Sequence, residues 1–241
     1  MIFEALVTLA SLAGGLIASL AGFGIGSMIT PLLAARLGMK VAVAAVAIPH
    51  VVGTAVRFWF LRDQLDRHVL MTFGLASAAG GLTGAVLHSW VEGRALAWLL
   101  AALLIFAGVT GLFDIQLRFG KRTAMAAGAL SGMLGGLVGN QGGIRAGAML
   151  GFEVRKEAFV ATSTAVALFI DGMRVPVYLW TEGRALLAIW PLVLASTIAV
   201  VAGTLLGRLI LGRISESLFK RVVSVLLIAL GVSMILIPSP R

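Results

Sequence analysis

Long stretches without a single charged residue decide what this chain can fold into. Residues 69–91 and 185–207 each run for 23 residues with no Asp, Glu, Lys or Arg, and residues 95–113 form a third such stretch. About 20 apolar residues in an α-helix rise about 30 Å, the thickness of the hydrocarbon core of a bilayer. The chain is therefore predicted to be an all-α polytopic membrane protein.

The composition agrees with a membrane location and argues against several other classes of protein. Hydrophobic residues make up 60% of the chain and charged residues 12%, against about one half and one quarter in soluble domains. The net charge of +9 comes from basic residues that stand singly or in pairs, with no basic stripe, so nucleic acid is not a predicted partner. The chain has no cysteine and its three histidines are isolated, so we predict no metal site and no cofactor.

The sequence can be aligned with itself at an offset of 117 residues. The offset pairs several glycines and makes two pairs of arginines: Gly22 with Gly139, Gly26 with Gly143, Arg57 with Arg174, and Arg67 with Arg184. Each half then contains about five helical segments, and an odd number predicts two inverted repeats, the plan of many secondary transporters. The predicted domains are a first membrane repeat at 1–113, a connecting loop at 114–122 and a second repeat at 123–241.

The first two segments of each half are too short to cross the membrane twice. Residues 5–35 carry no charge, but a helix of that length spans only about 46 Å. A broken or re-entrant helical hairpin fits this length, with its tip inside the membrane and Pro31 just beyond the tip helping to break the helix. The predicted tips are residues 22–27 (GFGIGS) and 139–143 (GNQGG).

Glycine-rich tips at membrane depth are candidate anion-binding elements. Backbone N–H groups can converge on a ligand there, and a half-helix that begins at the tip directs the positive end of its dipole toward it. The alternative is that the glycines only permit close helix packing in lipid. The tip residues predicted to bind substrate are Gly22, Gly24, Gly26, Ser27, Gly139, Asn140, Gln141, Gly142 and Gly143.

Arg57 and Arg174 lie at equivalent positions near the end of the third segment of each half, predicted at about 41–61 and 157–179. Their guanidinium groups either face a cavity, where they would bind an oxyanion, or reach the interface or pair with an acid. Asp171 lies one helical turn before Arg174 and would neutralise it. Thr54 takes that place before Arg57, so Arg57 is the better ligand candidate.

Three other positions bear on electrostatics and coupling. Arg145 breaks the symmetry, because Met28 occupies the equivalent position, and it either reaches the interface or adds positive potential beside the second tip. His50 and Asp171 are the titratable groups well inside segments and are the candidates for proton coupling. The alternative for His50 is a neutral ring hydrogen-bonded across helices.

Two glycine-rich stretches carry a resemblance to a known family. GLIASLAGFGIGSMITPLLAARLGM and GALSGMLGGLVGNQGGIRAGAMLGF resemble the two motif copies of the TauE/SafE family of sulfite and organosulfonate exporters. Ala148 and Gln141 stand where the first copy has Pro31 and Gly24, so the second copy departs from the pattern. The resemblance implies a duplicated membrane domain that carries small sulfur-containing or carboxylated anions, driven by the proton gradient.

The predicted function is secondary transport of a small anion such as sulfite or a short organosulfonate, as an exporter working by alternating access. The alternatives are a passive anion channel and a carrier of another small organic anion such as a carboxylate. An enzyme is not predicted, since no nucleophile with a base, carboxylate pair or metal cluster is visible. The predicted partners are the anion and the lipid bilayer, and the sequence leaves a homodimer open.

Loop charges predict how the chain lies in the membrane. Whether the opening hairpins are re-entrant or fully spanning, five basic residues fall on one side and eleven on the other. The five are Arg36, Lys40, Arg94, Arg184 and Arg241. Because cytoplasmic loops carry the excess of Lys and Arg, the richer side should be cytoplasmic. We therefore predict a multi-pass protein of the bacterial inner membrane with both termini outside.

Overall fold

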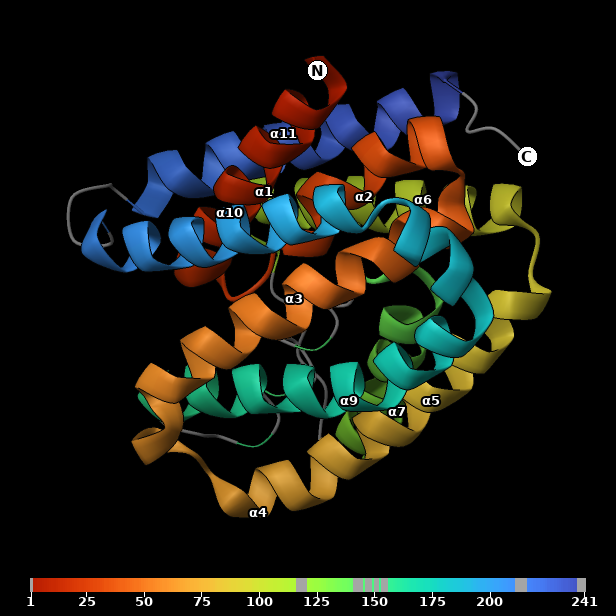
Figure 1. Cartoon of the computed structure of the whole chain (residues 1–241). Helices are drawn as coiled ribbons and strands as arrows, with labels where there is room; N and C mark the ends of the chain where they lie inside the picture. The colour runs from red at the N-terminus through yellow and green to blue at the C-terminus, as the bar shows by residue number, and fades with distance from the viewer. Residues whose placement is uncertain are drawn as a thin grey trace.

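The computed structural model describes residues 2–115, 121–140, 145, 149, 152, 156–210 and 216–237. Within these residues the chain forms helices and turns and no β-strand. The helices in chain order (Figure 1) are α1 (Ile2–Ala21), α2 (Ile25–Leu37), α3 (Met39–Leu61), a 3-10 turn η1 (Arg62–Gln64), α4 (Arg67–Val69), a π-helical turn η2 (Leu70–Gly74), α5 (Leu75–Trp90), α6 (Gly93–Leu112), α7 (Lys121–Val138), α9 (Lys156–Ala188), α10 (Trp190–Ile210) and α11 (Glu216–Leu236).

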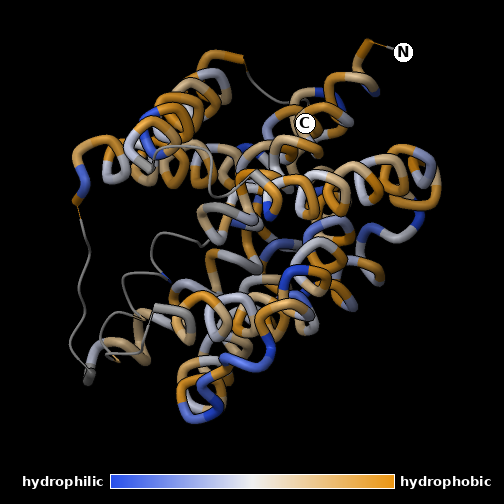
Figure 2. The backbone as a smooth tube through the Cα atoms, turned by 90° about the vertical axis from the view of Figure 1, so that its left-hand side faces the viewer, coloured by the Kyte–Doolittle hydropathy of each residue, from blue (hydrophilic) through white to orange (hydrophobic). Residues whose placement is uncertain are grey.

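Seven helical stretches of the described chain are long and apolar enough to cross a membrane. They are α1, α3, the continuous stretch from α4 to α5, α6, α9, α10 and α11. Large apolar side chains lie on the outer surface, with Leu187 74% exposed and Leu209 75% exposed. The tube in Figure 2 is largely apolar along these helices. The predicted all-α polytopic membrane fold is confirmed.

The opening helix of each half packs against the opposite half. α1 lies along α10 and α7 lies along α5, while α6 packs against α11 and α3 packs against α9 (Figure 1). Glycines allow this approach: a Cβ at Gly15 would collide with the Val200 backbone, and one at Gly132 would collide with the Ser77 backbone. α1 and α7 are the equivalent opening helices of the two halves, and α10 and α5 are equivalent to each other. The α1–α10 pair therefore corresponds to the α5–α7 pair. The inverted relation and the division at 114–122 stay predictions.

The first hairpin breaks at its glycines. α1 ends at Ala21 and α2 begins at Ile25, and between them Gly22 and Gly24 have φ of 80° and 137°, values that side chains with a Cβ avoid. α2 has 13 residues and rises only about 20 Å, less than the about 30 Å of the hydrocarbon core. The position of the break inside the membrane stays a prediction. Pro31 lies inside α2, and the glycines alone make the break.

One helix runs longer than its predicted segment at 157–179. α9 continues to Ala188, through Glu182 and Arg184, which the sequence placed in a loop. Pro176 lies inside this helix, and α9 bends toward α10 (Figure 1). The helix therefore continues through both charges without ending.

Helix ends on one face surround a cavity of about 870 Å³. Lys40, Glu92, Arg94 and Glu182 contribute to its lining. Because α3 and α6 begin at this cavity, their other ends, near Arg62 and Asp114, lie toward the opposite face. Lys40 and Arg94 thus share a face as predicted, whereas the direction in which that face points stays a prediction.

Candidate functional site

The two equivalent arginines make equivalent hydrogen bonds. Nη1 of Arg57 donates to the carbonyl oxygen of Ala18 at 2.6 Å, and Nη1 of Arg174 donates to that of Gly135 at 2.9 Å. The two acceptors are themselves 117 residues apart, as the two donors are. Each arginine therefore holds the negative, C-terminal end of the opening helix of its own half.

The chain breaks in the same way after each of these carbonyl groups. Gly22 (φ 80°) donates its N–H to Ala18, and Gly139 (φ 73°) donates its N–H to Gly135, both at 2.9 Å. The duplication seen in the sequence is thus repeated in backbone conformation. Both breaks require φ values that only glycine adopts readily.

The two tips are in contact. A Cβ added at Gly26 would lie 2.6 Å from the carbonyl oxygen of Gly139. α2 begins at this junction with Gly24 as its N-cap, without a side-chain cap and without an acid in its first turn, and Ser27 in that turn is buried. The first N–H groups of a helix have no acceptor within the helix. The positive end of α2 therefore points into the junction of the tips.

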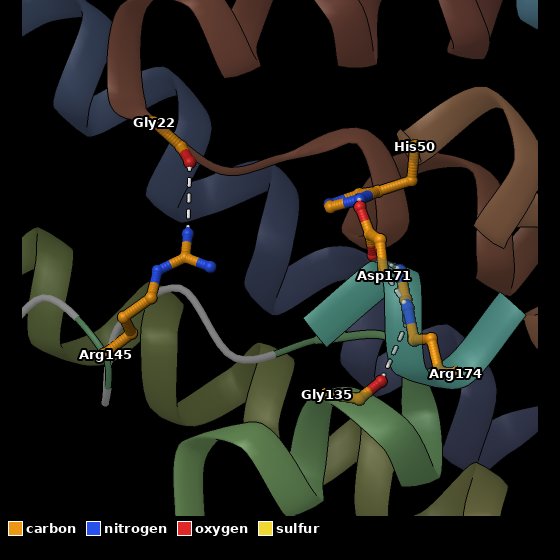
Figure 3. Close-up of polar contacts among 6 residues, drawn as sticks. All are labelled: Gly22, His50, Gly135, Arg145, Asp171 and Arg174. Carbon is orange, nitrogen blue, oxygen red and sulfur yellow. Dashed lines mark hydrogen bonds and ion pairs between the residues drawn. The ribbon is translucent and has the colours of Figure 1, made fainter. Parts of the chain in front are cut away.

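Asp171 joins the two halves (Figure 3). Its Oδ1 accepts a hydrogen bond from Nε of Arg174 at 2.8 Å and forms an ion pair with Nη2, also at 2.8 Å. Its Oδ2 accepts from Nδ1–H of His50 on α3 at 2.7 Å. The carboxylate is fully buried and both of its oxygens have donors, so it is engaged by these two partners.

Arg57 has no corresponding acid. Thr54 stands three residues before it on α3, where Asp171 stands before Arg174 on α9. Within the described chain, Nε of Arg57 and the hydroxyl of Thr54 are buried atoms without a hydrogen-bond partner. The first half therefore has donors at the place where the second half has an ion pair.

The guanidinium of Arg145 reaches from the second half to the first tip (Figure 3). Its Nη2 donates to the carbonyl oxygen of Gly22 at 3.5 Å, and its Nε donates to the Ser163 hydroxyl at 3.1 Å. The side chain is buried and interacts electrostatically with Arg57 and Asp171. The guanidinium group thus contacts the first tip, and its role in adding positive potential stays a prediction.

Two residues that the sequence analysis did not single out complete the end of α7. The Tyr178 hydroxyl donates to the Gly136 carbonyl, and Nδ1–H of His88 donates to that of Leu137 at 2.6 Å. The two rings are buried with centroids 5.1 Å apart. Together with Arg174, they supply donors to three consecutive carbonyl groups. The sequence did not indicate this role, because His88 is a lone histidine in an apolar segment.

Only some of the remaining predicted positions are among the residues that the structure describes. Asn140 is buried, and its Nδ2 has no hydrogen-bond partner in the described chain. Gln141, Gly142 and Gly143 lie outside the described residues. No group of three His, Cys, Asp or Glu residues suited to a metal occurs where the structure describes the chain. The substrate-binding roles of the tip residues and arginines stay predictions.

Among the residues that the structure describes, the charges around the tips do not balance. There, three buried guanidinium groups, of Arg57, Arg145 and Arg174, interact electrostatically with one carboxylate, that of Asp171. Guanidinium groups stay protonated in proteins, and a buried charge without a counter-charge costs several kcal/mol. The junction can therefore stabilise a small anion.

Comparison with known families points the same way. The sequence model of the family described as "Sulfite exporter TauE/SafE" matches residues 7–234, nearly the whole chain. Neither the curated proteins nor the solved structures contain a match. The resemblance carried by the two glycine-rich stretches thus extends over both halves. The chain belongs to the TauE/SafE sulfite exporter family of membrane transporters.

Proposed function

We propose that this transporter exports sulfite or a short organosulfonate by alternating access and binds the anion where the two tips meet. The observation that carries the proposal is the excess of buried positive charge at that junction. A compact oxyanion would supply the missing counter-charge. Guanidinium groups donate to such oxygens in a planar, charge-assisted arrangement.

Backbone groups add to this site. The N–H groups at the start of α2 are directed at the junction, and Gly26 brings them close to the second tip. An anion there would interact favourably with the positive end of the helix dipole. The proposed ligands are therefore the arginines together with the tip amide groups.

The location of the site supports alternating access. The tips belong to different halves, so a movement of one half against the other would change which face the anion reaches. The His50–Asp171 hydrogen bond joins α3 to α9 and so crosses the boundary that would move. A proton taken up on the ring of His50 would turn this hydrogen bond into an ion pair and strengthen the link, and its release would weaken the link again, which makes the pair our candidate for proton coupling.

Uptake into liposomes tests the function. We expect the wild-type protein to take up labelled sulfite, and Arg57→Gln to lower that uptake at least about tenfold, since a hydrogen bond to a charged group contributes about 1.5–3 kcal/mol. The matched control is Arg62→Gln, because Arg62 is exposed and stacks on Trp59. Equal uptake by Arg57→Gln and Arg62→Gln would remove Arg57 from the site, and no uptake of sulfite or taurine by the wild type would contradict the proposed substrates.

The same liposomes distinguish the alternatives. A carrier preloaded with unlabelled sulfite should accelerate the entry of labelled sulfite, whereas a passive channel should not. A carrier of carboxylates would take up acetate in preference to sulfite. Counterflow with sulfite is the expected result.

Single cysteines test the membrane orientation. The natural chain has no cysteine, so Glu92→Cys and Asp63→Cys introduce one thiol each, at opposite ends of the helix bundle. With both termini outside, a membrane-impermeant maleimide should label the Glu92→Cys variant in intact cells and the Asp63→Cys variant only after lysis. The reverse pattern would invert the predicted topology.

A further inference from the structure

The second half shows how a carboxylate binds beside one of the paired arginines. Nη1 of Arg174 is fixed on the carbonyl group of Gly135, which leaves Nε and Nη2 to hold Oδ1 of Asp171. The carboxylate comes from the same helix, three residues earlier, the spacing at which side chains meet on one face. Arg174 is thereby neutralised within the protein.

The first half repeats the arginine but not the carboxylate. Nη1 of Arg57 is fixed on the carbonyl group of Ala18 in the equivalent bond. Thr54 stands three residues before Arg57 on α3, as Asp171 stands before Arg174 on α9. Both the Nε atom and the Thr54 hydroxyl are buried and lack partners within the described residues, and unmet buried donors of this kind are unusual in folded proteins.

We propose that the transported anion binds in the first half at the position that the Asp171 carboxylate occupies in the second half. One anionic oxygen accepts from Nε of Arg57, and the hydroxyl of Thr54 donates to the anion as a second ligand. This inference rests on the proposed function and adds Thr54 as a binding residue. It separates the two arginines by role: Arg57 touches the substrate, and Arg174 positions the second tip.

The geometry explains why the duplication is incomplete at this pair. A carboxylate in both halves would neutralise both arginines and leave less attraction for a substrate. A threonine keeps a small hydroxyl donor and leaves the charge of Arg57 for an anion from outside. The electrostatic interaction of Arg145 with Arg57 adds to the attraction at this position.

Supplying the carboxylate from the protein tests the inference. Thr54→Asp recreates the Asp171–Arg174 arrangement beside Arg57, and we expect sulfite uptake into liposomes to fall to the level of protein-free vesicles. In detergent, sulfite should raise the thermal unfolding midpoint of the wild type and no longer raise that of Thr54→Asp. In Thr54→Asn the new side chain has the same size as aspartate but no charge, so this variant should lose far less uptake. The difference in uptake between the two variants therefore measures the effect of the negative charge.

A milder variant keeps the test valid if Thr54→Asp does not accumulate in the membrane. Thr54→Val removes only the hydroxyl, and we expect the sulfite concentration for half-maximal uptake to rise about five- to tenfold, the usual effect of one lost hydrogen bond. The control is Thr164→Val, since Thr164 is equally buried but its hydroxyl donates within its own helix, to the Val160 carbonyl. Thr164→Val should transport like the wild type.

The outcomes separate the inference from the function on which it rests. The role of Thr54 would be overturned if the wild type transports sulfite and Thr54→Asp transports it equally well. It would also be overturned if Thr54→Val leaves the sulfite concentration for half-maximal uptake unchanged. Either result would leave the proposed transport function standing. Absence of wild-type uptake of sulfite and organosulfonates would instead remove the proposed function. Loss in Thr54→Asp with a several-fold change in Thr54→Val supports the inference.

Discussion

Replacing Asp171 with asparagine is expected to destabilise the folded protein by about 3–5 kcal/mol, the usual cost of removing one partner from a buried ion pair. Arg174 is 1% exposed and Asp171 is fully buried, and the carboxylate is the acid that neutralises this guanidinium. The same change weakens the hydrogen bond from His50. The Asp171→Asn variant would thus have a buried cation without its counter-charge and a looser contact between α3 and α9.

Unfolding in mixed micelles with increasing sodium dodecyl sulfate measures this effect. The matched control is Asp114→Asn, because Asp114 pairs with Lys220 at the surface and its side chain is 67% exposed. Exposed ion pairs contribute less than about 1 kcal/mol, so this control should unfold close to the wild type. If the two variants unfolded together, the charge of Asp171 would not be what stabilises Arg174.

The sequence predicted the helical membrane fold because the relevant signal is local. Runs of 20 or more uncharged residues have few alternatives to a spanning helix, and the breaks at Gly22 and Gly139 follow from glycine-rich stretches. The end of α9 was predicted less well. Glu182 and Arg184 look like loop residues in a hydropathy pattern, as do Pro176 and Gly183 near them, but α9 continues through all four.

The candidate site was partly predictable for a related reason. The offset of 117 residues identified Arg57 and Arg174, and the i, i+3 spacing was enough to identify the neutralising role of Asp171. Contacts between the halves do not follow a fixed spacing of residues in the sequence. The bond from His50 to Asp171 and the reach of Arg145 to Gly22 depend on how α3, α9 and the tips pack, which one sequence does not specify.

The close approach of the two tips gives the second large prediction. Gly26→Ala places a Cβ 2.6 Å from the carbonyl oxygen of Gly139, well inside van der Waals contact. Backbone lies on both sides of this contact, so neither partner can turn away as a flexible side chain would, and overpacking of this kind costs about 1–3 kcal/mol. The tips would have to separate, and we expect sulfite uptake into liposomes to fall at least about tenfold.

A second glycine shows whether such a loss is specific to the tips. Gly172 also lies in a helix, but a Cβ there would meet nothing within 4 Å, and alanine is the better helix former by about 1 kcal/mol. Gly172→Ala should therefore insert and transport like the wild type, or be slightly more stable. Equal uptake by Gly26→Ala and Gly172→Ala would mean that the anion does not need the tips in contact. A loss confined to Gly26→Ala would instead tie transport to the junction where the buried positive charge is concentrated, because that substitution changes no charge and removes no ligand side chain.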